Sequence, residues 1–120
     1  MVQSLVRETI TTWVDVCSLS AITPNTGVCA LVEGQQVAIF RVGHENDVYA
    51  ISNYDPFSKA YVLSRGIVGD RNGIPKVASP IYKQNFNLIT GQCLDDEIVS
   101  IPTYPVKVVE GRVQVAVLGE

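Results

Sequence analysis

The chain has 120 residues, of which 47% are hydrophobic, and its net charge is -3 with a pI near 5.0. This length suits one domain with one core. Lysine and arginine residues do not cluster, so the sequence argues against nucleic acid and anionic membranes as partners. No apolar run reaches membrane-spanning length, and residues 1–13 lack the apolar stretch of a secretory signal. We therefore expect a cytoplasmic protein.

Short segments rich in valine and isoleucine, separated by Gly, Asn, Asp or Pro, predict an all-β domain. Three tight turns are expected, at EGQQ after Val32, at GHEND after Val42 and at Glu110 with Gly111. An antiparallel β-sandwich or small barrel follows. We expect a flexible segment at residues 1–10 and a single domain at 11–120. The predicted strands are residues 13–17, 27–32, 36–42, 48–52, 76–79, 85–88, 105–110 and 112–117.

Two long loops are predicted between these strands, at residues 53–59 and 79–91. We expect residues 61–75 to form a solvated, mobile connection between them. The sequences VYAISNYDPFSKA and SPIYKQNFNLITGQCL, followed by TYPVKVVEGRVQVAV, resemble the Rieske iron–sulfur domain over nearly the whole chain. In that family each of two loops carries a cysteine and a histidine that bind the cluster. The resemblance implies a Rieske-like fold with two protruding loops at the cluster-binding tip.

Each ligand position of the family holds a different residue here. Asp55 and Ser79 stand where the two cysteines would be, and Phe57 and Tyr82 stand where the two histidines would be. A Rieske cluster needs two thiolates and two imidazoles. Phenylalanine has no lone pair to donate, and the other three residues offer only oxygen. The sequence therefore predicts a domain that kept its shape and carries no metal or cofactor of its own.

The remaining candidate metal ligands do not form a site in the sequence. Cys17, Cys29 and Cys93 are odd in number and widely spaced, which does not predict a disulfide framework. A zinc site that combines them with His44 lacks a close cysteine pair. We expect the cysteines to be structural or incidental and His44 to be a solvated turn residue.

A cluster-free Rieske-like domain of this pattern is similar to the small subunits of bacterial assimilatory NADH-dependent nitrite reductase, the NirD type. That resemblance implies a large subunit that carries FAD, an iron–sulfur cluster and siroheme and reduces nitrite to ammonium. This chain would be a non-catalytic subunit docked on it, because the sequence holds no nucleophile with its base and no phosphate-binding glycine loop. Aromatic and cationic side chains at the two loops are typical of interfaces. The candidate partner-binding residues are Tyr54, Phe57, Lys59, Tyr61, Ile81, Tyr82, Lys83 and Gln84.

Other interpretations remain open at this level. Phe57 and Tyr82 can instead turn inward and fill the volume that a cluster would occupy. Asp55 and Tyr82 can form a proton-handling pair. The chain can also be a free-standing β binding module, or a redox partner of the ferredoxin type.

Overall fold

The structure is a computed structural model that describes residues 10–43 and 47–118. The segment expected to be flexible, residues 1–10, lies outside the described residues apart from Ile10, and His44 lies outside them as well. Every strand pair in the described ranges is antiparallel. The predicted all-β antiparallel architecture is therefore confirmed. Among the described residues, no helix is long and apolar enough to cross a membrane.

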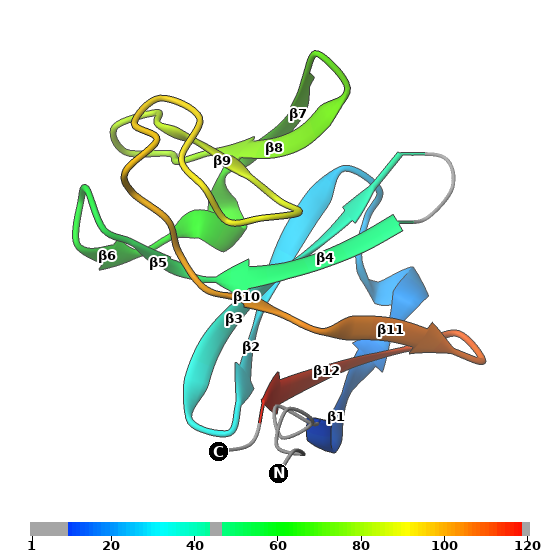
Figure 1. Ribbon diagram of the computed structural model, residues 1–120. Coiled ribbons are helices and arrows are strands. Elements are labelled where there is room, and N and C mark those ends of the chain that lie inside the picture. Colours follow the sequence, from blue (N-terminus) through cyan, green and yellow to red (C-terminus); the bar gives the residue numbers. More distant parts are fainter. Residues whose placement is uncertain (1–9, 44–46, 119–120) are drawn as a thin grey trace, which may run out of the picture.

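Four sheets build the domain (Figure 1). One sheet has the order β1-β12-β11, and a second has the order β10-β4-β3-β2. The hairpin β5-β6 and the sheet β7-β8-β9 lie away from the sheet β1-β12-β11 (Figure 1). Of the two 3-10 helices in the described ranges, η2 connects β1 to β2 and η3 connects β6 to β7. The bounds are β1 (Ile10–Ser18), η2 (Leu19–Ala21), β2 (Thr26–Val32), β3 (Gln35–Val42), β4 (Asp47–Ser52), β5 (Tyr54–Asp55), β6 (Ala60–Tyr61), η3 (Leu63–Arg65), β7 (Ile67–Arg71), β8 (Ile74–Ala78), β9 (Asn85–Asn87), β10 (Thr103–Tyr104), β11 (Val106–Val109) and β12 (Arg112–Leu118).

Strand β3 separates two hydrophobic cores. Successive side chains of a strand point to opposite faces of the sheet. Ala38 and Phe40 therefore join the core beneath β8 and β9, which we call the upper core. Val37 and Ile39 join the core enclosed by β1, β2 and β12, which we call the lower core. All four side chains are fully buried. The uninterrupted apolar run VAIF in β3 reflects burial on both faces.

The structure corrects the expectation of a solvated loop at residues 61–75. This stretch contains the end of β6, η3, β7 and the start of β8. Asn72 and Gly73 have φ values of 52° and 86°, so they form the turn of a β7-β8 hairpin. An Asn-Gly pair favours this turn because both residues tolerate positive φ. The signal was present in the sequence, but Gly69, Asp70 and Pro75 obscured the alternation of the flanking strands.

Asn53 holds the base of the first protruding loop. Its side chain is 2% exposed. The side-chain oxygen accepts a hydrogen bond from the Ser64 N–H at 2.7 Å, and the side-chain nitrogen donates to Gln36 Oε1 at 3.1 Å. Its carbonyl accepts from the Leu63 N–H at 3.1 Å. The end of β4 is thereby tied to both β3 and η3.

Gly91 provides a stability test of this architecture. It has a φ of +82°, and a Cβ at this position would collide with the Ile101 carbonyl oxygen. We expect Gly91→Ala to lower the free energy of unfolding by about 3 kcal/mol, because backbone strain and overpacking add. Gly73→Ala is the matched control, since Gly73 has a similar φ of +86° with no atom within 4 Å. The control should cost about 1 kcal/mol. Urea unfolding followed by circular dichroism measures both, and equal losses would contradict the steric explanation.

Candidate functional site

The first protruding loop is a tight turn between β5 and β6. The Lys59 N–H donates to the Asp55 carbonyl at 2.7 Å, and Lys59 adopts a positive φ of 60°. Asp55 Oδ1 accepts a hydrogen bond from the Phe57 N–H at 2.9 Å. An aspartate side chain that binds the backbone two residues further on stabilises such a turn.

The second protruding loop repeats this construction. The Lys83 N–H donates to the Ser79 carbonyl at 3.1 Å, and Lys83 has a φ of 68°. Ser79 Oγ accepts from the Ile81 N–H at 3.3 Å. Both loops share the pattern Xaa-Pro-Xaa-Xaa-Lys, as DPFSK and SPIYK. Sequence reasoning missed this internal repeat, although comparing the two segments would have shown it.

A buried hydrogen bond joins the two loops. Ser79 Oγ donates to Asp55 Oδ2 at 2.5 Å, and Ser58 Oγ donates to the same oxygen at 2.9 Å. Asp55 and Ser79 are both fully buried. They occupy the two positions at which the resemblance to the Rieske domain places cysteine ligands. The two loops are thus held together by a direct contact between Asp55 and Ser79, the first residues of the segments DPFSK and SPIYK.

The pKa of Asp55 reflects two opposing effects. Burial raises the pKa of this carboxyl group, because the charged form loses its hydration. Hydrogen bonds from Ser79, Phe57 and Ser58 lower it by a larger total amount, so the pKa lies below the usual aspartate value. Asp55 is therefore a charged acceptor whose hydrogen bonds come from both loops.

Phe57 and Tyr82 point in different directions. Phe57 is half-buried and packs against the core, with its ring centroid 6.1 Å from that of Phe86. Tyr82 is 61% exposed. Phe57 therefore fills interior volume, as the interpretation of inward packing predicts. Tyr82 does not. Tyr82 is also absent from the described hydrogen-bond partners of Asp55, so the structure does not bring these two together as a proton-handling pair.

These residues do not fit a Rieske cluster. Asp55 and Ser79 are buried oxygen donors already engaged with each other, and Phe57 has no donor atom. Iron in such clusters requires thiolate and imidazole ligands. Within the described ranges, no three His, Cys, Asp or Glu side chains gather in a geometry that could hold a metal ion. Cys17 is half-buried, Cys29 exposed and Cys93 buried, and all three are free thiols.

Several of the predicted partner-binding residues form an exposed surface at the tip. Tyr61 is 57% exposed and Ile81 is 46% exposed, and Lys59 and Lys83 are exposed beside them. Tyr54 is half-buried and packs against Tyr61, with ring centroids 5.0 Å apart. We call the exposed set the tip surface, which consists of Lys59, Tyr61, Ile81, Tyr82 and Lys83.

Two further features lie beside the tip surface. Gln84 carries a buried side-chain oxygen without a hydrogen-bond partner among the described residues. A groove of about 450 Å³ runs from Tyr54 and Tyr61 to Tyr104 and the exposed Leu31. We call it the tyrosine groove. Sequence reasoning missed it because its lining comes from segments that are distant along the chain.

The chain is similar to known proteins in both sequence and structure. Residues 12–116 match the model of the Rieske-like [2Fe-2S] domain. The nitrite reductase (NADH) small subunit of Salmonella typhimurium is 50% identical over 102 residues, which cover 85% of this chain and 94% of that protein. A Mycobacterium tuberculosis structure described as an NADH-dependent nitrite reductase small subunit superimposes with a TM-score of 0.88 at 50% identity, covering 92% of this chain and 99% of that one.

A third relative is a much longer protein. The nitrite reductase [NAD(P)H] large subunit of Klebsiella oxytoca is 43% identical over 103 residues, which cover 86% of this chain and 11% of that protein. The fold and the two paired loops define a Rieske-like domain whose ligand positions hold other residues. Within that class, the chain belongs to the family of nitrite reductase (NADH) small subunits.

The contact between Asp55 and Ser79 predicts a pH-dependent contribution to stability. Because the folded-state pKa of Asp55 lies below its ordinary value of about 4, its contribution is fully present above that value and is lost as pH falls through the folded-state pKa. We expect Asp55→Asn to lower the free energy of unfolding by about 1 to 2 kcal/mol at neutral pH. The difference from wild type should shrink below about pH 4.

Urea titrations at a series of pH values measure this difference. Asp70→Asn is the control, because Asp70 is exposed and accepts one hydrogen bond, from the Gly73 N–H at 3.1 Å. It should change stability by less than about 0.5 kcal/mol. A loss in Asp55→Asn that stays constant down to strongly acidic pH would contradict the assigned role of the carboxylate.

Proposed function

We propose that this chain is the non-catalytic small subunit of an NADH-dependent nitrite reductase, which reduces nitrite to ammonium in nitrate assimilation in the cytoplasm. FAD, an iron–sulfur cluster and siroheme belong to the large subunit, and this chain docks on that subunit without a cofactor of its own. The observation that supports the proposal most directly is the hydrogen bond between Asp55 and Ser79. The resemblance to the Rieske domain places both residues at positions of metal ligands. Membership of the small-subunit family directs the choice of partner.

The chemistry of the tip supports a role in binding rather than in electron transfer. A ferredoxin-type redox partner needs a redox centre, and the residues at the tip offer buried oxygen atoms and an aromatic ring in its place. The Ser58 and Ser79 hydroxyl groups donate to the Asp55 carboxylate, but the lowered pKa of Asp55 makes it a poor general base for activating either serine. What the tip offers to solvent is tyrosine, isoleucine and lysine.

The Klebsiella oxytoca relative supports the choice of partner. A segment of that nitrite reductase large subunit is 43% identical to this chain, so a domain of this kind is covalently part of that polypeptide. A domain that is fused in one protein and separate in another is expected to occupy a similar place in both assemblies. The tip surface is the face we propose for the contact, since exposed tyrosines contribute strongly to interface energies.

The absence of a cluster is directly testable on the purified chain. We expect substoichiometric iron and acid-labile sulfide and no visible absorption band, because Phe57 and the Asp55–Ser79 pair cannot supply the four ligands. Chemical analysis and an absorption spectrum provide the measurement. Iron and sulfide in the proportions of a [2Fe-2S] cluster would overturn the cofactor-free role and favour the redox-partner alternative.

Docking is testable with the holo large subunit. We expect Tyr61→Ala and Tyr82→Ala each to weaken binding by about tenfold, which corresponds to about 1.4 kcal/mol. Both side chains are more than half exposed, so the fold should persist. Val109→Ala is the control, because Val109 is 42% exposed in β11, away from the tip (Figure 1). Calorimetric titration gives the affinities. Wild-type affinity in both tyrosine variants would exclude the tip surface as the docking face.

A further inference from the structure

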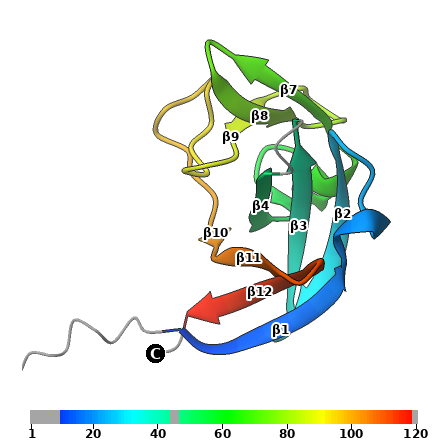
Figure 2. The ribbon, with the colours of Figure 1, turned by 90° about the vertical axis from the view of Figure 1, so that its right-hand side faces the viewer.

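The wall of the lower core is open between strands β1 and β2. Each is an edge strand, one of the sheet β1-β12-β11 and the other of the sheet β10-β4-β3-β2. Their Cα atoms lie more than 8 Å apart along nearly all of their length. Figure 2 shows β1 running across the bottom of the molecule and β2 running up its right-hand side. Directly paired antiparallel strands have Cα atoms about 4.5 to 5.5 Å apart, so these edges do not pair.

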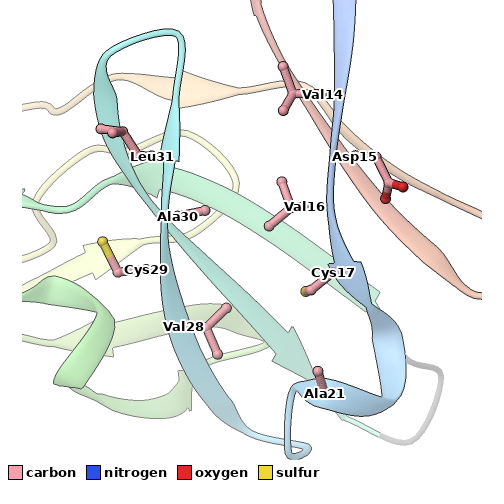
Figure 3. A pocket seen from close by; sticks show the side chains of 9 residues that line it. All are labelled: Val14, Asp15, Val16, Cys17, Ala21, Val28, Cys29, Ala30 and Leu31. Atoms are coloured by element: carbon pink, nitrogen blue, oxygen red, sulfur yellow. The ribbon is translucent and has the colours of Figure 1, made fainter.

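A groove of about 380 Å³ occupies this opening (Figure 3). We call it the seam. Residues 14–17 of β1 form one side of it, residues 28–31 of β2 form the other, and Ala21 closes one end. Val16, Val28 and Ala30 are half-buried and pack against the lower core, so the seam exposes core side chains to solvent. Asp15 is the one charged residue in its lining.

The two edges have few of the features that usually protect exposed strands. Strand β1 carries Asp15 and two register shifts against β12, and β2 carries no charged residue. Edge strands in natural proteins commonly carry lysine or proline, because unpaired N–H and C=O groups otherwise recruit another strand. Strand β1 has nine residues and β2 has seven, and neither contains a lysine, arginine or proline. Among the described residues, no backbone hydrogen bond joins β1 to β2. The open edges therefore present backbone donors and acceptors on both sides of one groove.

We propose that the seam accepts an extended, uncharged segment of the large subunit, which inserts as a strand between β1 and β2. Neighbouring strands lie about 4.8 Å apart, so one inserted strand requires edges about twice that distance apart, which is compatible with Cα separations above 8 Å. Residues 14–17 and 28–31 run in opposite directions in Figure 3, so the inserted strand is antiparallel to one edge and parallel to the other. Small apolar side chains on its inner face would cover Val16, Val28 and Ala30.

The choice of occupant rests on the proposed function and on continuity with the tip surface. Leu31 is 71% exposed and lines both the seam and the tyrosine groove. The tyrosine groove in turn contains Tyr61 of the tip surface. One partner can therefore follow an unbroken path from the tip to the seam. The nearly uncharged lining requires an uncharged segment, since burying an unpaired charge is costly.

Cys29 is a natural reporter for this inference, because it lines the seam and is exposed, whereas Cys93 is buried in the upper core. The experiment compares iodoacetamide alkylation of Cys29 in the free chain and in its complex with the holo large subunit, with mass spectrometry as the readout. Partial loss of hydration raises the pKa of the Cys29 thiol. The reaction is therefore run at about pH 9, because the thiolate is the form that reacts. We expect alkylation to be at least tenfold slower in the complex. Amide hydrogen exchange at residues 14–17 and 28–31 should slow as well.

A pair of variants tests the same path by affinity. Leu31→Asp should weaken the complex about tenfold, whereas Ile67→Asp should leave it unchanged. Ile67 is the matched control, because it is 68% exposed on β7 and lines neither groove. Equal affinities for the two variants would overturn the inference.

The outcomes separate this inference from the proposed function. If no complex forms, the proposed function fails and the inference fails with it. A complex that leaves Cys29 and the two edges unprotected would overturn the inference alone, as would Cys29 shielding without slower amide exchange. If removal of residues 1–9 speeds the alkylation of Cys29 in the free chain, the occupant of the seam is that segment of the chain itself. Concentration-dependent protection with dimer formation would show a second copy. Either result would overturn a partner strand.

Discussion

Burial of β3 on both faces is the constraint on which the rest of the domain depends. Ala38 and Phe40 belong to one core, and Val37 and Ile39 belong to the other. The sheet that contains β3 therefore separates the two cores and contributes side chains to both. The protruding loops are built on the upper core, and the seam opens into the lower one. The two proposed binding features thus share one rigid support.

At the tip, a hydrogen bond takes the place at which the wider Rieske family uses metal ligands. Asp55 and Ser79 each organise their own turn through a backbone N–H and then bind each other. A charge-assisted hydrogen bond contributes far less than a set of metal–ligand bonds. The packing of Phe57 on Phe86 and the hydrogen bonds of the Asn53 side chain also stabilise the loops. Several weaker contacts within the protein therefore order the two turns.

The tip surface and the seam differ in the kind of contact they can make. Tyr61, Ile81 and Tyr82 present side chains, which suits a folded partner surface. The edges of β1 and β2 present backbone groups, which suit an extended segment. A partner that engages both would be held by a surface contact and by strand addition. The tyrosine groove, with Leu31 at its border, connects the two.

The sequence by itself determined much of the architecture and the nature of the tip. Local chemistry is enough to predict a turn such as Glu110–Gly111. The resemblance to the Rieske domain is enough to predict that Asp55, Phe57, Ser79 and Tyr82 stand at ligand positions. The Asn72–Gly73 hairpin was within reach of the same reasoning, since its signal is local. Only the tertiary structure decided that Asp55 and Ser79, 24 residues apart, bind each other. It also decided that Phe57 turns inward and Tyr82 outward, and that β1 and β2 remain unpaired. These features depend on which surfaces meet and how fully volume is filled, and neither property is encoded in any short segment.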